Sequence, residues 1–144
     1  LYETGWMHNR VRMIVASFLV KHLRIHWMEG EKHFKNCLVD YNEASNVAQW
    51  QWVAGCGADA APYFRIFNPI IQGEKFDKEG IYTKRWVPEL LNMPNKFLYK
   101  PWELEKKYQE QIKVVIGKNY PEPMVDHAAA RSAALEAFQK IKKN

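Results

Sequence analysis

Apolar residues recur at helical spacing along most of the chain. Between residues 6 and 23 the pattern has a period near 3.6, with Val11, Ile14 and Val15 on one face and no glycine or proline inside. We expect one long helix there, a second from about 31 to 39 and a third from about 43 to 53. Neither of the last two segments alternates with the period of two that is typical of a strand. The pattern predicts an all-α fold.

The segment from Gly55 to Asp77 breaks this periodicity. It is rich in aromatic residues, glycine and proline, which predicts a long, packed loop of the kind that often carries function. A short helix is expected within 78–91 and should end near Pro88. A last helix should follow Asp126, a plausible N-cap. The expected architecture is all-α with one or two large ordered loops.

The first helix has a second stripe of unusual composition. Asn9, Arg12, Met13 and Ala16 follow one another at helical spacing, so polar and apolar groups share that stripe. A charge at Arg12 is costly there unless it is paired. Asp40 is a candidate partner, and the alternative is an arginine that reaches out to water.

Two tryptophans of the third helix point in different directions. Asn46 and Trp50 are four residues apart and share a face, whereas Trp52 is turned by roughly 200° from Trp50. Polar side chains would line a pocket beside Trp50: Arg12, Asp40, Asn42 and Asn46. Such a pocket suits a planar, anionic, hydrogen-bonding heterocycle, and the alternative is a structural network that is satisfied internally.

Composition restricts the number of domains and the class of partner only a little. With 144 residues and 47% hydrophobic content, the chain is expected to form one globular domain. Lys and Arg exceed Asp and Glu by 21 to 16, which favours an anionic partner such as nucleic acid. Cys37 and Cys56 show no metal-binding spacing, so we expect no metal site, and neither a secretory signal nor a membrane span is evident. The default compartment is a reducing cytosol.

Several long motifs together resemble one known family. In chain order they read "TGWMHNRVRM", "DYNEASNVAQWQW", "DAAPYFRIFNPIIQGEKFD", "RWVPEL" and "YPEPMVDHAAAR". They are similar to the C-terminal FAD-binding region of the DNA photolyase/cryptochrome family, most of all to class I cyclobutane pyrimidine dimer photolyases. The chain starts without methionine at the threshold of a helix. We therefore expect residues 1–144 to be the C-terminal part of the helical domain, with the antenna domain and the first helical part outside them.

The resemblance implies a light-driven lyase. In this family a reduced anionic FAD, excited by blue light, donates an electron to a pyrimidine dimer flipped out of DNA. The implied partner is DNA that contains such dimers, and an antenna chromophore would sit on the domain outside this chain. No membrane partner is expected, and the implied location is a bacterial-type cytoplasm, at the nucleoid when bound to DNA.

The resemblance also assigns the cofactor residues. Arg12 matches an arginine over the flavin ring, paired with Asp40, and its cation would stabilise a buried anionic ring. Asp40, Tyr41 and Asn42 match an FAD-contacting tripeptide. Asn46 matches the residue that faces flavin N5. Plant cryptochromes typically carry aspartate there, which can donate a proton, so the amide favours a photolyase.

Two tryptophans match members of an electron-transfer chain. Trp50 matches the member next to the flavin and Trp27 the middle member, whereas the third has no counterpart in these residues. Without the resemblance, both would be interpreted as ordinary core aromatics.

The DNA-facing residues are assigned in the same way. Asn9 and Arg10 match residues at the dimer pocket and the backbone. Met13 and Trp52 match walls of that pocket, where an aromatic face stacks on the flipped lesion. On the long loop the matching residues are Gln72 and Lys75, with Arg65 a weaker candidate. The alternative for the charged ones is a solvated surface.

Two positions depart from the family pattern. Asn42 stands where many relatives have a second aspartate, which removes a charge near the flavin edge and leaves an acceptor. Gln49 stands where glycine is frequent, and it adds bulk beside the tryptophans.

We further expect the isolated chain to be enzymatically incomplete and prone to self-association through apolar surface. The competing functions are a cryptochrome-like photoreceptor and a helical interaction module with a degenerate flavin site.

Overall fold

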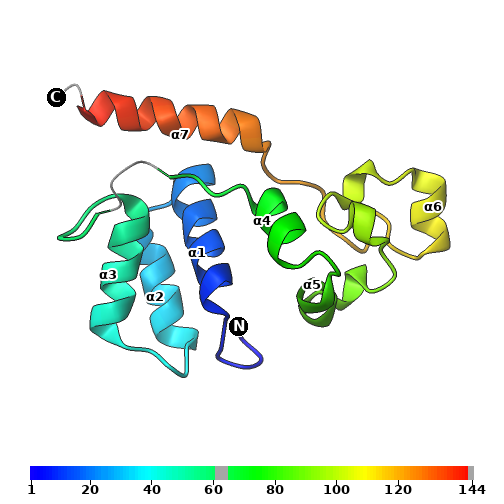
Figure 1. Cartoon of the computed structure of the whole chain (residues 1–144), viewed down its shortest axis with the longest axis horizontal. Helices are drawn as coiled ribbons and strands as arrows, with labels where there is room; N and C mark the ends of the chain where they lie inside the picture. The colour runs from blue at the N-terminus through cyan, green and yellow to red at the C-terminus, as the bar shows by residue number, and fades with distance from the viewer. Residues whose placement is uncertain (61–64, 143–144) are drawn as a thin grey trace. The chain divides into compact units, whose positions relative to one another are not determined.

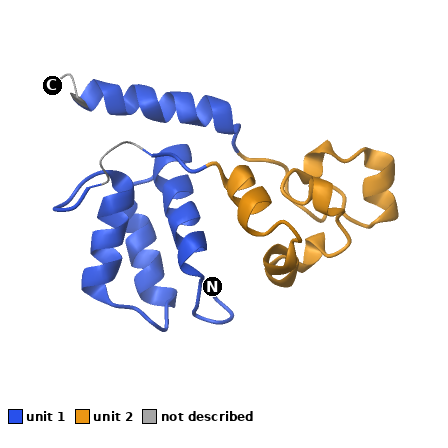
Figure 2. Cartoon of the chain, viewed as in Figure 1, with its two compact units in different colours: residues 1–67, 125–144 blue, residues 68–124 orange. Residues whose placement is uncertain are grey.

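The computed structural model describes residues 1–60 and 65–142. These residues form two compact units, one built from residues 1–67 and 125–144 and the other from 68–124 (Figure 2). The sequence predicted a single domain, whereas each unit has its own hydrophobic cluster. The described residues contain helices and no strand, with one isolated bridge between Ile116 and Tyr120, so the all-α expectation is confirmed.

The first unit contains the three helices predicted near the N-terminus and the one predicted near the C-terminus. Their bounds are α1 Asn9–Ser17, the π-helical turn η1 Phe18–His22, α2 Trp27–Cys37, α3 Glu43–Ala54 and α7 His127–Lys142. Figure 1 shows α1, α2 and α3 side by side, with α1 and α3 starting at the same end. The expected long helix over 6–23 begins later, at Asn9, because the side chain of His8 caps it by accepting from Arg10 N.

Capping residues set the ends of the other helices in this unit. Asn42 Oδ1 accepts from Ser45 N at 3.0 Å and starts α3, which ends at Gly55 in the left-handed region with φ 79°. Asp126 Oδ1 accepts from Ala129 N at 2.7 Å, which confirms the predicted N-cap of α7. Local sequence therefore fixes where these helices start.

The core of the first unit lies among α1, α2 and α3. Its buried members are Ala16, Phe34, Leu38, Trp50 and Val53. The Trp50 ring is 2% exposed and meets Phe34 edge-on, with ring centroids 5.1 Å apart. A glycine makes this packing possible, because a Cβ on Gly30 would lie only 2.1 Å from the Trp50 ring.

The π-helical turn buries two basic side chains that hold distant segments. Lys21 Nζ donates to the carbonyl of Arg65, and burial together with the charge of Arg65 lowers the pKa of Lys21 to about 8. His22 Nε2 and His127 Nδ1 lie 2.8 Å apart, so η1 contacts the start of α7. Burial and the nearby His127 lower the pKa of His22. Turns of this type are frequently found at functional positions.

The second unit consists of short helical segments around a small core. They are α4 Pro69–Phe76, α5 Ile81–Trp86, the 3₁₀ turns η2 Pro88–Leu90, η3 Asn95–Phe97 and η4 Pro101–Glu103, and α6 Lys106–Gln111. The core is formed by Leu90, Met93, Leu98, Leu104 and Val114. The short helix predicted within 78–91 is confirmed by α5, which ends before Pro88.

The predicted loop over 55–77 is wrong in its last third. Asn68 Oδ1 accepts from Ile70 N and Ile71 N, and Pro69 occupies the first turn of α4. Proline was interpreted as a breaker, although at this position it favours a helix start because its missing N–H would be unpaired anyway. Residues 61–64 of the segment lie outside the described part.

Candidate functional site

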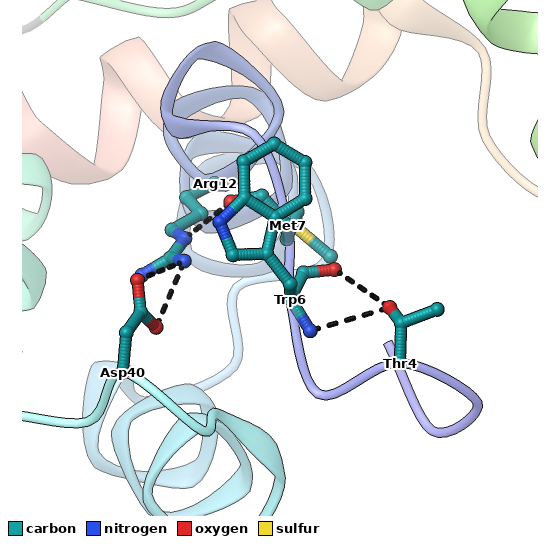
Figure 3. A network of polar contacts seen from close by, with 5 residues as sticks. All are labelled: Thr4, Trp6, Met7, Arg12 and Asp40. Atoms are coloured by element: carbon teal, nitrogen blue, oxygen red, sulfur yellow. Dashed lines mark hydrogen bonds and ion pairs between the residues drawn. The ribbon is translucent and has the colours of Figure 1, made fainter.

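An arginine paired with a carboxylate marks one end of a pocket in the first unit. One Arg12 amino group, Nη2, donates to both oxygens of Asp40, at 3.0 Å to Oδ1 and 2.9 Å to Oδ2 (Figure 3). Arg12 Nε donates to the carbonyl of Met7 at 2.7 Å, which fixes the plane of the guanidinium. The predicted partnership of Arg12 and Asp40 is confirmed, and the alternative of an unpaired, solvated arginine is wrong.

The segment before α1 folds back beside this pair. Trp6 N donates to Thr4 Oγ1, and Thr4 Oγ1 donates to the Trp6 carbonyl, each at 3.3 Å. Figure 3 shows these contacts of Thr4 with the Trp6 backbone, and 46% of Trp6 is exposed. The Trp6 ring meets His8 edge-on, with ring centroids 6.2 Å apart.

The pocket has a volume of about 310 Å³ and is enclosed by α1, the end of α2 with the following loop, and α3. Its lining comprises Asn9, Arg12, Met13, Ala16, Phe34, Leu38, Asp40, Tyr41, Asn42, Ser45, Asn46, Gln49, Trp50 and Val53. Because α1 and α3 start at the same end, their first turns bring polar groups together there, whereas Ala16 and Val53 lie further along. The positive ends of both helix dipoles also lie at that end, which favours a negative charge.

The structure brings together all the residues predicted to contact the cofactor. Asp40, Tyr41 and Asn42 line the pocket from the loop before α3, and Asn46 and Trp50 line it from one face of α3. The shared face of Asn46 and Trp50 was predicted from their spacing alone. Their roles toward a flavin remain predictions.

Glu31 is a site residue that sequence reasoning missed. Asn46 Nδ2 donates to a carboxylate oxygen of Glu31 at 3.0 Å and to its backbone carbonyl at 3.1 Å. The Tyr41 hydroxyl also donates to that carboxylate, at 3.5 Å. A signal was available, because Glu31 stands at helical spacing from Phe34 and Leu38 on the buried stripe of α2. The carboxylate orients two residues of the pocket.

The two predicted electron carriers occupy one cluster. Trp50 is buried and lines the pocket, and Trp27 is partly buried and packs against the same cluster at the start of α2. Trp52 is not part of the pocket lining. It is partly buried and packs against the same hydrophobic cluster. The two tryptophans of α3 therefore have different surroundings, as their spacing predicted.

The residues predicted to face DNA divide between the two units. Asn9 and Met13 line the same pocket as Arg12, whereas Arg10 lies outside its lining. Arg65 is exposed in the first unit, with its guanidinium carbon 4.5 Å from the centroid of the Phe67 ring.

Gln72 and Lys75 belong to the second unit. Both lie on α4, three residues apart, so their expected position on a loop is wrong. Helical spacing places them on neighbouring positions of one helix face.

Other classes of site are not evident in the described residues. Within residues 1–60 and 65–142, no group of three His, Cys, Asp or Glu side chains is placed to hold a metal ion. In that part of the chain no helix is both long and apolar enough to cross a membrane.

Comparison with known proteins gives a consistent family. Residues 1–140 match the family model described as the FAD binding domain of DNA photolyase. A deoxyribodipyrimidine photo-lyase of Agrobacterium fabrum is 58% identical over 143 residues, which are 99% of this chain and 30% of that protein. The chain thus spans about 30% of the length of this curated relative.

Solved structures show the same relationship. The crystal structure of a bacterial class III photolyase from Agrobacterium tumefaciens has a TM-score of 0.91 at 58% identity, over 97% of this chain and 29% of that one. A cryptochrome of Synechocystis sp. PCC6803 has a TM-score of 0.86 at 41% identity, over 92% of this chain and 27% of that one. The sequence motifs pointed to class I, whereas the first of these structures is of a class III enzyme. With a family model that covers nearly its whole length, the chain belongs to the family of FAD-binding domains of DNA photolyase.

Proposed function

We propose that this chain supplies the flavin-ring site of a light-driven DNA repair enzyme that splits cyclobutane pyrimidine dimers. The observation that carries the proposal is the pocket that brings together the Arg12–Asp40 ion pair, the amides of α3 and the buried Trp50 ring. The names of the relatives support the reaction. Bound FAD would supply the absorption of light and the electron that cleaves the dimer.

The lining fits a flavin ring. A volume of about 310 Å³ lies at the lower end of the range for small-ligand sites, which suits the ring system and not the whole dinucleotide. The polar end around Arg12 suits the polar edge of the ring, and the apolar end around Ala16 and Val53 suits its hydrocarbon edge. We infer that contacts to the remainder of FAD come from outside this pocket.

The charges of the site suit an anionic ring. The Arg12 cation stabilises negative charge nearby, and Asp40 keeps the guanidinium oriented. Asn46 is fixed by Glu31 through its Nδ2, so its carbonyl oxygen is the atom left for a ligand. An amide cannot act as a proton donor in the way an aspartic acid can, and this favours repair over a receptor that protonates its flavin.

Trp50 and Trp27 are the proposed route for electrons into the site. Trp50 combines burial with a place in the pocket lining, and Trp27 packs against the same cluster. Replacing Trp50 with Phe should slow photoreduction of the bound flavin and leave binding of dimer-containing DNA unchanged. Trp52, Asn9, Arg10 and Met13 are proposed for the lesion side, and Arg65, Gln72 and Lys75 for the phosphate backbone.

FAD binding is tested first, in the full-length protein that carries this chain. Arg12→Gln should weaken FAD binding at least tenfold, because hydrogen bonds to charged groups are worth about 1.5–3 kcal/mol. Arg24→Gln is the matched control, since Arg24 is exposed and outside the pocket lining. Equal affinity of the two variants for FAD, measured by titration of the apoprotein, would contradict the proposed ring site.

A stoichiometric flavin spectrum from residues 1–144 alone after gel filtration would contradict the expected incompleteness of the isolated chain.

Repair is tested with the reduced full-length protein under blue light. An oligonucleotide with one thymine dimer should regain two thymines, as measured by chromatography after digestion. The cryptochrome similarity supports a second candidate, a blue-light receptor that binds FAD without repairing DNA. Bound and photoreducible flavin without any repaired thymine would favour that receptor. Unchanged FAD occupancy in Arg12→Gln would favour the helical interaction module.

The remaining proposals concern context. We propose DNA containing pyrimidine dimers as the partner, which the excess of basic residues supports. The proposed location is the bacterial cytoplasm, at the nucleoid. Exposed apolar side chains such as Tyr2, Val39 and Ile141 support self-association of the isolated chain. Light scattering of that chain against concentration measures it.

A further inference from the structure

Gln49 lines the pocket from the exposed side of α3. Gln49 lies four residues after Ser45, which is also exposed, and four before Val53, which is buried further along the helix. Gln49 is exposed, whereas Asn46 is 9% exposed and Trp50 2%. The side chain therefore stands at the mouth of the pocket.

Most polar groups around the pocket already have protein partners. Arg12 is held by Asp40 and Met7, Asn42 Oδ1 accepts from Ser45 N, and Asn46 Nδ2 donates to Glu31. In contrast, the side-chain amide of Gln49 makes no hydrogen bond to any residue that the structure describes, and the same holds for the Asn9 amide in the lining. A donor and an acceptor are thus available together at the mouth.

Helix geometry places this amide next to the one that is fixed by Glu31. Gln49 follows Asn46 by three residues, which is a rise of about 4.5 Å along the axis and a rotation of about 60° around it. A planar ring that lies along α3 with one edge at Asn46 therefore extends past Gln49. A glutamine side chain is long enough to reach such a ring from the helix surface.

We propose that Gln49 is a further ligand-contacting residue, whose amide N–H donates a hydrogen bond to the edge of the flavin ring and whose methylenes cover the mouth of the pocket. This inference rests on the proposed function. A donor at the ring edge stabilises negative charge on the ring, and a cover at the mouth keeps water away from it. Gln49 thereby raises both FAD affinity and the midpoint potential of the bound flavin.

The test uses the full-length protein and two replacements of Gln49. Gln49→Leu keeps the size and removes the hydrogen bond, and Gln49→Glu keeps the reach and adds negative charge. Gln51→Leu is the matched control, because Gln51 is on the same helix and outside the pocket lining. FAD affinity is measured by calorimetric titration of the apoprotein, the midpoint potential by spectroelectrochemistry, and folding by circular dichroism.

We expect Gln49→Leu to weaken FAD binding about 2- to 12-fold, the effect of one net hydrogen bond. Its midpoint potential should fall, that of Gln49→Glu should fall further, and Gln51→Leu should match the unchanged protein. If Gln49→Leu keeps the affinity and the potential of Gln51→Leu, the inference is overturned and the flavin site stands. If the unchanged protein binds no FAD, the proposed function fails together with it.

Discussion

A single methyl group added at Gly30 tests how tightly the site is built. In Gly30→Ala the new Cβ would lie 2.1 Å from Cη2, 2.4 Å from Cζ3 and 2.6 Å from Cζ2 of Trp50. The ring cannot move away freely, because it is 2% exposed and packed edge-on against Phe34. Overpacking of this kind costs about 3 kcal/mol at its upper end, and alanine recovers about 1 kcal/mol of helix propensity. We expect a net loss of about 2 kcal/mol.

Thermal unfolding followed by circular dichroism measures this loss. In a unit of this size 2 kcal/mol corresponds to a fall of roughly 10 °C in Tm. The control is the same change in a Trp50→Phe background, where the three clashing ring atoms are absent and alanine should be tolerated. An equal loss in both backgrounds, or none with Trp50 present, would refute the reasoning. The affinity for FAD should fall with the displaced ring, because Trp50 also lines the pocket.

Three further predictions concern the first unit. Asp40→Ala should lower the free energy of unfolding by less than about 1 kcal/mol, because the Asp40 side chain is 49% exposed, and a larger loss in urea melts would contradict this. The lowered pKa of His22 means that the unfolded state binds more protons, so unfolding becomes easier as pH falls below about 6.5. Melts at pH 7.5 and 5.5 should differ less in His22→Gln, and an unchanged difference would exclude His22 as its source. Asp126→Ala removes the cap of α7 and should cost about 1 kcal/mol, while Asp126→Asn should retain most of the stability.

Local sequence was sufficient to predict features that involve residues within about one helical turn, such as caps and shared helix faces. The cap at Asp126 was predicted from residue type alone and is present, because capping involves residues only three apart. The shared face of Asn46 and Trp50 follows from the helical period. The start of α4 at Asn68 was missed although its signal is also local, since the proline content of 55–77 was taken as a sign of a loop and Pro69 was not considered as a first-turn residue.

Contacts between remote segments could not be predicted in the same way. His22 and His127 are 105 positions apart in the sequence. Glu31 of α2 accepts a hydrogen bond from Asn46 of α3. Such pairs depend on how helices dock, which periodicity does not specify. The ion pair of Arg12 and Asp40 is an exception, because a charge on that mixed stripe predicted a partner and Asp40 was the candidate named for it.

By itself the sequence determined the helical class, the shared face of Asn46 and Trp50, the cap of the last helix at Asp126 and, through its motifs, the family. Tertiary structure alone decided that the helix faces enclose a pocket of about 310 Å³, that Glu31 fixes Asn46, and that the Gln49 amide meets no hydrogen-bond partner among the described residues. The physical reason is that a side chain's direction is set by its own helix, whereas its neighbours are set by the packing of several helices.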